Sequence, residues 1–203
     1  NIPILSFIFL LGKCRNCKKQ INILYIVVEA ISIVSFIIVY YYFSITLTTL
    51  LLMILSIFFI IVFFIDLKHF VIPNELTFPL MFIGFIKSFD PNLNANIFPN
   101  FINSLIGGIL GYLVIWSIIY FYKQVRKKEG MGLGDAKLMA VVGFWFGWFS
   151  IPFIIFIASV CALLIVAPSL INKSRKMSSE IPFGPYIIIA TVIYVSFSDL
   201  LKF

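Results

Sequence analysis

Long apolar runs alternate with short polar segments along the whole chain. An apolar run of roughly 20 residues can cross a bilayer as a helix, so the pattern predicts an all-α, polytopic membrane protein with about seven transmembrane helices and short cytoplasmic loops. The third and fifth runs are short, and we expect them to begin deeper in the membrane or to be completed by the preceding loop residues. The predicted spans are Ile23–Phe43, Ile45–Ile65, Leu76–Phe89, Phe101–Tyr122, Ala136–Phe149, Ile151–Ile171 and Phe183–Leu201.

The composition agrees with a membrane protein. Of the 203 residues, 62% are hydrophobic and 11% are charged, whereas soluble domains carry about 45–50% apolar and about 25% charged residues. No internal repeat and no soluble appendage is visible. The chain begins at Asn1 without a basic stretch followed by a cleavage site, so we interpret its N-terminus as missing rather than as a signal peptide.

The positive charge of the chain indicates an orientation. The net charge is +7, but the Lys and Arg residues fall almost entirely on one side of the predicted spans. Cytoplasmic loops are enriched in Lys and Arg, so this side is predicted to be cytoplasmic, and no nucleic-acid binding is expected. It holds 13 of the 15 basic residues: Lys13, Arg15, Lys18, Lys19, Lys68, Lys123, Arg126, Lys127, Lys128, Lys137, Lys173, Arg175 and Lys176.

Two carboxylates stand at the ends of apolar runs on the predicted cytoplasmic side. Asp135 follows Gly132-Leu133-Gly134, and Asp66 follows the second run. Ionisable groups at the edge of hydrocarbon are costly and are functional by default. Each aspartate also has a structural interpretation. Asp135 could be the N-cap of its helix, on glycines that supply unusual backbone angles, and Asp66 could be a water-facing helix end before the helix that Pro73 starts.

Considered together, the two carboxylates favour catalysis. The spans between them form an antiparallel hairpin that can return Asp135 to the depth of Asp66. Two acids held close together cannot both ionise at low cost, so one keeps its proton while the other acts as a base, and the pair titrates jointly. The ionised carboxylate would activate water and the protonated one would polarise the scissile carbonyl, without a metal. Such acid–base help typically contributes about 10²–10⁴-fold in rate.

Four segments resemble motifs of the bacterial type IV prepilin peptidases, a family of GxGD aspartic peptidases. They are Asn1–Cys17 with its pair of cysteines, Asp66 with Ile72-Pro73, the GxGD stretch Glu129–Leu138 and the IPFGPY signature Ile181–Tyr186. The resemblance covers nearly the whole chain in the expected order. It divides the chain into residues 1–22, a remnant of a cytoplasmic cysteine-containing loop of the methylation region, and residues 23–203, a transmembrane aspartic peptidase domain.

The resemblance implies that Asp66 and Asp135 are the catalytic aspartates of a peptidase of the cytoplasmic (inner) membrane, with its site facing the cytoplasm. Its substrates would be prepilins and pseudopilins, cut after a short basic leader. Asn74 departs from the acidic residue that is common after the proline in this family, and we expect this departure to be tolerated. The residues expected to bind substrate or to support the site are Gly132, Gly134, Pro73, Glu29 and Lys137.

Cys14 and Cys17 form a single CxxC pair. A structural zinc site requires four ligands, and in the related enzymes an upstream pair completes the set, in a region tied to N-methylation of the new pilin N-terminus. The peptidase step itself is expected to need no cofactor. Zinc and S-adenosylmethionine are therefore expected only if that upstream region is present. The alternative is a pair of reduced cytosolic thiols.

Glycines near the predicted helices have packing interpretations. Gly107 and Gly111 put small residues one turn apart in the fourth span, a spacing that lets membrane helices approach closely. Phe183-Gly184-Pro185 opens the last span, either as a structural helix start or as part of a groove for the transmembrane segment of the substrate.

Two other classes of function remain open from the sequence. A proton- or ion-coupled transporter also uses membrane carboxylates, although such proteins usually show repeated halves and acids near the midplane. A non-catalytic scaffold for pilus or secretion assembly is the third possibility. The lipid bilayer is an expected partner in every case, and the oligomeric state stays open.

Overall fold

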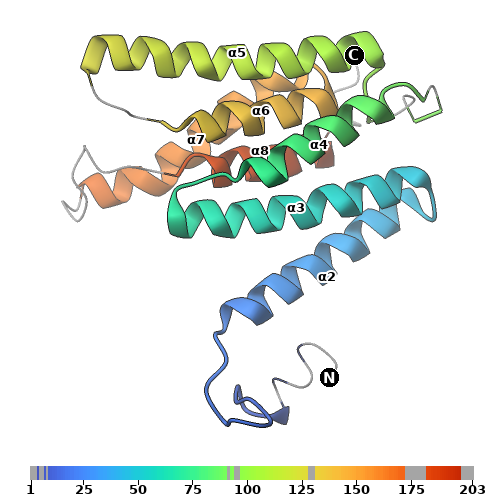
Figure 1. The fold of residues 1–203 in the computed structure, drawn as a ribbon, viewed down its shortest axis with the longest axis vertical. Helices are drawn as coiled ribbons and strands as arrows, with labels where there is room; N and C mark the ends of the chain where they lie inside the picture. Colours follow the sequence, from blue (N-terminus) through green and yellow to red (C-terminus); the bar gives the residue numbers. More distant parts are fainter. Residues whose placement is uncertain are drawn as a thin grey trace. The chain divides into compact units, whose positions relative to one another are not determined.

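Seven helices make up the regular structure of the described residues (Figure 1). The computed structural model describes residues 4, 7, 9–90, 92–93, 97–127, 131–171 and 182–197. Within these ranges β pairing is limited to one isolated bridge between Lys13 and Gln20. The helices are α2 (Leu24–Phe43), α3 (Leu47–His69), α4 (Asn74–Lys87), α5 (Phe101–Arg126), α6 (Leu133–Phe146), α7 (Ser150–Ile171) and α8 (Gly184–Phe197).

Each predicted span corresponds to one helix, but the predicted number of membrane crossings is only partly confirmed. Four helices are long and apolar enough to cross a bilayer, namely α2, α3, α5 and residues 150–167 of α7. Helices α4, α6 and α8 have 14 residues each. A helix of that length measures about 21 Å, less than the roughly 30 Å hydrocarbon core. The chain is thus a helical, multi-pass membrane protein with four candidate spans in its described part. The predicted end of the last span, Leu201, lies outside the described residues.

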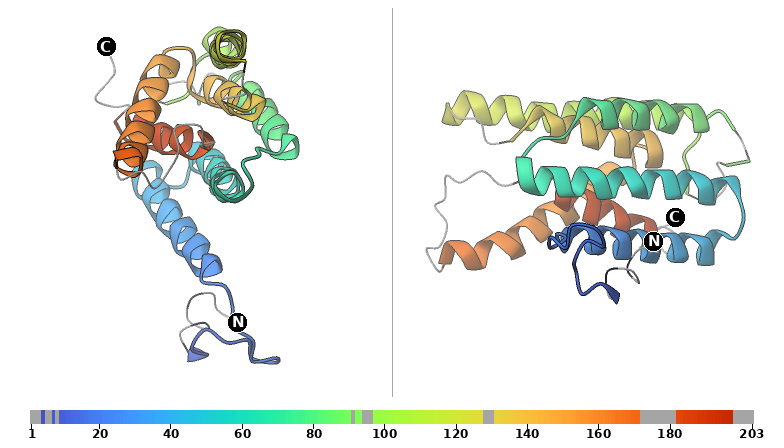
Figure 2. Two further views of the ribbon diagram at one scale, coloured as in Figure 1. Left: turned by 90° about the vertical axis from the view of Figure 1, so that its left-hand side faces the viewer. Right: turned by 60° about the horizontal axis from the view of Figure 1, so that its bottom comes forward.

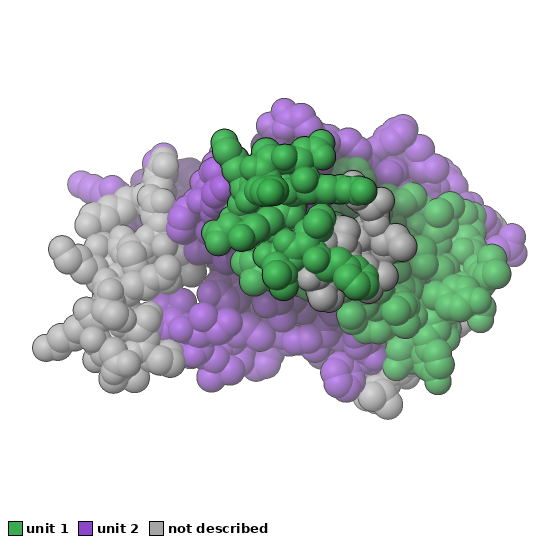
Figure 3. All heavy atoms as spheres, turned by 90° about the horizontal axis from the view of Figure 1, so that it is seen from below, with its two compact units in different colours: residues 1–60 green, residues 61–203 purple. Residues whose placement is uncertain are grey.

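The chain forms two compact units, residues 1–60 and residues 61–203 (Figure 3). The first unit contains α2, the first part of α3 and the loop that precedes α2. The second unit contains the last part of α3 together with α4 to α8. Both candidate aspartates belong to the second unit, so the candidate site is built within it.

Helix α6 is the central helix of the second unit. Ten of its 14 residues are buried, and a helix that is apolar on all sides is one that neighbours must surround. It packs most extensively along α5, and it also contacts α4, α7 and α8 (Figure 2). The helix that carries Asp135 is therefore held from several sides.

Helices α5 and α6 touch backbone to backbone at their glycines. A Cβ atom on Gly107 would collide with the carbonyl oxygen of Gly143, and a Cβ atom on Gly143 would collide with that of Gly107. One turn further along, a Cβ atom on Gly111 would lie 2.5 Å from the carbonyl oxygen of Met139. The predicted role of Gly107 and Gly111 in close helix packing is confirmed, and the neighbouring helix is α6.

The C-terminal end of α6 is fixed by side chains from α4 and α5. The last carbonyl groups of a helix have no partner within the helix. Here Ser104 Oγ donates to the carbonyl of Phe144 at 2.7 Å, and the buried Lys87 Nζ donates to the carbonyl of Trp145 at 3.0 Å. The Lys87 ammonium also lies 3.9 Å from the ring centroid of Phe98, a cation–π contact. Lys87 thus connects the end of α6 to α4 through its hydrogen bond to Trp145.

Replacing Lys87 by methionine is expected to lower the free energy of unfolding by about 1–3 kcal/mol, because the buried carbonyl of Trp145 loses its donor. The midpoint of thermal unfolding in detergent micelles measures this effect. Lys68→Met removes an ammonium from an exposed position, and as the matched control it should change the midpoint little. Equal midpoints for Lys87→Met and the unsubstituted protein would show that the hydrogen bond from Lys87 to Trp145 does not stabilise the fold.

Candidate active site

Asp66 lies in the last turn of α3, which continues to His69 rather than ending at the predicted Ile65. Its side chain is 4% exposed, so the interpretation of Asp66 as a water-facing helix end is wrong. Phe70 has a left-handed conformation (φ 57°), and its N–H donates to the Asp66 carbonyl at 2.9 Å, an arrangement that terminates helices. The chain then extends to Pro73, the N-cap of α4. This turn fixes Asp66 at the junction of α3 and α4.

Asp135 lies in the first turn of α6, three residues after the N-cap Gly132. The prediction that Asp135 is itself the N-cap is wrong, because α6 begins at Leu133 and not at Ala136. The Asp135 carboxylate turns back to the backbone N–H of Gly132, as the third helical residue does in a capping box. Its side chain is 7% exposed. The carboxylate is therefore held at the start of the central helix and away from bulk water.

A third segment reaches both aspartates. Helix α8 begins at Gly184, whose backbone N–H donates to Oδ2 of Asp66 at 3.1 Å. The same N–H also interacts with the Asp135 carboxylate, and the Asp66 carboxylate interacts electrostatically with that of Asp135. Ends of three helices that are distant in the sequence meet here, and the structure brings the predicted pair of aspartates together.

This arrangement is suited to acid–base chemistry. Two buried carboxylates within electrostatic range share a proton more readily than they ionise together. A site that excludes bulk water strengthens every charge interaction within it. The pair can therefore present one proton donor and one proton acceptor to the same reacting group.

Neither glycine before Asp135 supplies an unusual backbone angle. Gly132 has φ −81°, and Gly134 is not among the glycines with positive φ. A Cβ atom on Gly134 would lie 2.9 Å from Cβ of Ile72, so the segment before α4 packs directly on the first turn of α6. The expected conformational role of these two glycines is wrong, and for Gly134 close packing replaces it.

Lys137, in the second turn of α6, hydrogen-bonds to the first residue of α4. Its Nζ donates to Oδ1 of Asn74 at 2.6 Å and lies 5.7 Å from the ring centroid of Phe78. Asn74 follows the N-cap Pro73, so this bond connects the two helix starts that flank the aspartates. Asn74 accepts a bond that a carboxylate could also accept, which gives a physical reason for the departure from the family pattern to be tolerated.

Replacing Asn74 by aspartate is expected to raise the free energy of unfolding by about 0.2–1 kcal/mol, because an exposed ion pair with Lys137 replaces a hydrogen bond to a neutral amide. Thermal unfolding at low salt measures the gain, and salt should screen it. The same substitution in a Lys137→Met background should bring no gain. If the gain persists in that background, the pairing with Lys137 is refuted.

Glu29 and the cysteine pair belong to the first unit, and not to the unit that holds the aspartates. The Glu29 carboxylate accepts a hydrogen bond from the backbone N–H of Ile4 at 3.1 Å. In the structure Glu29 therefore ties the start of the chain to α2.

Cys14 and Cys17 lie in a tight turn. The Cys14 carbonyl accepts from the Lys18 N–H at 3.0 Å, and hydrogen bonds from the backbone N–H groups of Cys17 and Asn16 lower the pKa of the Cys14 thiol. A lower pKa favours the thiolate, the form that binds metal. Among the described residues no group of three His, Cys, Asp or Glu side chains could hold a metal ion. The two thiols are fewer than the four ligands that a structural zinc site requires.

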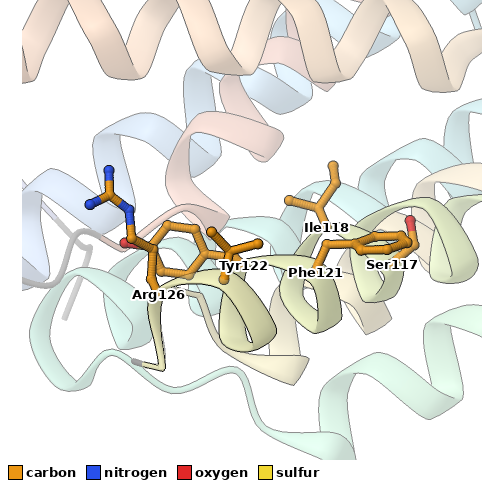
Figure 4. A pocket seen from close by; sticks show the side chains of 6 residues that line it. Ser117, Ile118, Phe121, Tyr122 and Arg126 are labelled. Carbon is orange, nitrogen blue, oxygen red and sulfur yellow. The ribbon is translucent and has the colours of Figure 1, made fainter.

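A shallow, wide-open apolar groove on the C-terminal half of α5 is lined by residues of that helix alone, and neither aspartate lines it (Figure 4). Helix α5 is one of the four candidate spans, and apolar faces of such helices normally contact lipid. We assign this groove no part in the chemistry. It is lined by Ser117, Ile118, Phe121, Tyr122, Val125 and Arg126.

The sequence does not reveal the backbone donor of the site. It marks Phe183-Gly184-Pro185 as a helix start or as the lining of a groove, and the first of these is confirmed because α8 begins at Gly184. A backbone N–H carries no side-chain signal, so its role can be read only from its position. The one available signal is a glycine where a helix begins.

Apolar helices and a buried pair of carboxylates define the class, a multi-pass membrane protein with a site suited to acid–base hydrolysis. Comparison with known proteins gives the family. Residues 53–167 match the type IV leader peptidase family, and residues 1–43 match the bacterial peptidase A24 N-terminal domain. The chain therefore belongs to the type IV leader peptidase family, and its class of activity is peptide hydrolysis.

Individual relatives agree with this assignment. A prepilin leader peptidase/N-methyltransferase of Aeromonas salmonicida (strain A449) is 34% identical over 199 residues, which is 98% of this chain and 67% of the relative. Proteins with the same name from Pseudomonas aeruginosa and Dichelobacter nodosus are each 33% identical, over 98% and 94% of this chain and 67% and 63% of the relative. The chain thus spans about two thirds of the length of these relatives. No solved structure gives a significant match.

Proposed function

We propose that this chain is an aspartic endopeptidase that removes the leader peptide of type IV prepilins and pseudopilins, with Asp66 and Asp135 as its catalytic residues. The observation that carries the proposal is the meeting of these two buried carboxylates at the start of α6, with the Gly184 N–H beside both. The names of the relatives support the substrate class.

In the proposed reaction one carboxylate acts as the general base and the other as the general acid. The ionised carboxylate takes a proton from a water molecule, which attacks the scissile carbonyl carbon, while the protonated carboxylate donates a hydrogen bond to the carbonyl oxygen. In the second step the C–N bond breaks, and the leaving amine nitrogen receives a proton from the pair. The products are a new carboxyl terminus on the leader and a new amino terminus on the pilin. Acid–base help of this kind typically contributes about 10²–10⁴-fold in rate.

The proposed place of reaction is the cytoplasmic face of the membrane. Asp66 lies in the last turn of α3, a candidate span that ends with Lys68 and His69. Thirteen of the 15 Lys and Arg residues fall on the side of the chain to which this end belongs, and such an excess is typical of cytoplasmic loops. We further propose that the short helices α4, α6 and α8 cross the bilayer together with the four long helices.

The proposed peptidase step requires no cofactor. Cys14 and Cys17 would supply two of the four thiolates of a structural zinc site, and the other two donors would have to come from outside the described residues. The relatives carry a second named activity, N-methyltransferase.

The purified protein should cut a prepilin once, between its leader and the mature pilin, in detergent micelles or in liposomes. Mass spectrometry of both products identifies the bond. A proton-coupled transporter or an assembly scaffold would leave the prepilin intact. Absence of cleavage by folded protein, over a time in which a family relative cuts completely, would overturn the proposal.

A further inference from the structure

The start of α8 is buried against the aspartates. Gly184 is the first residue of this 14-residue helix, and it is buried together with the two residues that follow it. The first backbone N–H groups of a helix have no partner within the helix, and they lie at the positive end of its dipole. The Gly184 N–H donates its hydrogen bond to Oδ2 of Asp66, at 3.1 Å. A helix start is thus aimed at the candidate catalytic pair.

Position 184 has no room for a side chain. A Cβ atom there would lie 2.6 Å from Oδ2 of Asp66 and 3.1 Å from Cδ1 of Ile72. Gly184 is not among the glycines with positive φ, so its backbone conformation is open to other residues. The restriction at this position is therefore one of space, and the space is taken by the aspartate itself.

Ile72 connects the starts of two helices at this place. Its side chain is 7% exposed, and it packs against both Gly134 of α6 and Gly184 of α8. Because both contacts are with glycines, the backbone of both helix starts lies directly against the Ile72 side chain. The two carboxylates accept hydrogen bonds from backbone N–H groups, of Gly184 for Asp66 and of Gly132 and Gly184 for Asp135.

We propose that Gly184 is the positioning residue of the aspartate pair. Its N–H, at the start of α8, holds the Asp66 carboxylate beside that of Asp135, and its missing side chain leaves the room that this approach requires. The statement about catalysis rests on the proposed peptidase function, whereas the contact between Gly184 and Asp66 can be tested without it. A displacement of about 1 Å at a reacting group can cost about 10²-fold in rate.

The contact is tested by a double-mutant cycle on stability. Gly184→Ala and Asp66→Ala are made singly and together, and the midpoint of thermal unfolding in detergent micelles is measured for all four proteins. Gly184→Ala should lower the midpoint strongly when Asp66 is present and by less than half as much in the Asp66→Ala background, because the colliding carboxylate is then gone. Val192→Ala, at an exposed position of the same helix, should give the same change in both backgrounds. Equal effects of Gly184→Ala in both backgrounds would overturn the contact.

The consequence for catalysis is tested on folded Gly184→Ala protein with a prepilin substrate. We expect kcat to fall about 10²-fold or more while KM stays within about threefold, because the reacting groups are displaced and the binding surface is not. The pH–rate profile should also move by about one unit, since the hydrogen bond to a charged carboxylate is altered. If kcat falls only in proportion to the folded fraction, and the pH–rate profile does not shift along the pH axis, the positioning role is overturned. If the unsubstituted protein fails to cut, the peptidase proposal fails, and the stability cycle still decides the contact.

Discussion

Asp66→Asn and Asp135→Asn should each reduce leader cleavage by about 10²–10⁴-fold or more, because each removes one member of the proton donor–acceptor pair. Asparagine has nearly the same shape as aspartate, so the packing around α3, α6 and α8 should survive. Initial rates at saturating prepilin, with the products separated by mass, give kcat for each variant.

Two controls separate loss of chemistry from loss of structure. The midpoint of thermal unfolding should stay the same or rise in both variants, because each substitution removes the repulsion between two acids held close together. Asp90→Asn changes a carboxylate whose Oδ1 accepts from the Asn92 N–H, outside the site, and it should leave kcat within about twofold. If Asp66→Asn or Asp135→Asn cuts at the unsubstituted rate, the two-carboxylate mechanism is wrong.

Gly143→Leu should produce the largest loss of stability among single substitutions in the second unit. A Cβ atom at this position collides with the backbone of Gly107 on α5. The clash can be relieved only if the backbone of one helix moves away from the other. Overpacking a core costs typically about 1–3 kcal/mol and more where the backbone must shift. We expect a fall in the midpoint of thermal unfolding large enough to leave little folded protein at 37 °C.

The matched control enlarges a residue on the same pair of helices where there is open space. Ile109 is 50% exposed on α5, and Ile109→Phe should leave the unfolding midpoint nearly unchanged in detergent. If Gly143→Leu is as stable as Ile109→Phe, the backbone contact between α5 and α6 is not a major source of stability. Activity measured on this folded variant would then show whether the contact serves the site instead.

The helical membrane class, the existence of the helices and the two aspartates could all be predicted from the sequence. Apolar runs near 20 residues permit few structures other than helices in lipid, and a carboxylate after such a run is conspicuous. The spacing of Gly107 and Gly111 predicted close packing, which the structure confirms against α6. These features depend on local patterns, and local patterns are visible in a sequence.

The features that could not be predicted from the sequence depend on contacts between distant segments. The alternative interpretation of Asp135 as an N-cap is wrong because the chain enters the helix earlier, at Leu133, where Gly134 packs against Ile72 within the first turn. Lys87, one of two basic residues on the predicted outer side, is buried on a carbonyl of α6. The donor at Gly184 is a backbone group from α8. No pattern within one segment specifies such contacts.

The lengths of the helices could not be predicted from the apolar runs alone. An apolar run marks where a helix can lie in lipid, but α4 and α6 are 14 residues long and are set by turns at their starts. Pro73 and Gly132 are the N-caps that define these starts. The N-cap at Gly132 places Asp135 in the first turn of α6, and Pro73 starts α4 just after the end of α3 that carries Asp66.

The most direct test of the central idea compares the doubly substituted protein, Asp66→Asn with Asp135→Asn, to the two single variants in the same cleavage assay. If the aspartates share one catalytic task, removing the second costs no more than about threefold beyond removing the first, because the pair acts as a unit. Losses that multiply, so that the double variant is slower by the product of the two single effects, would contradict the account.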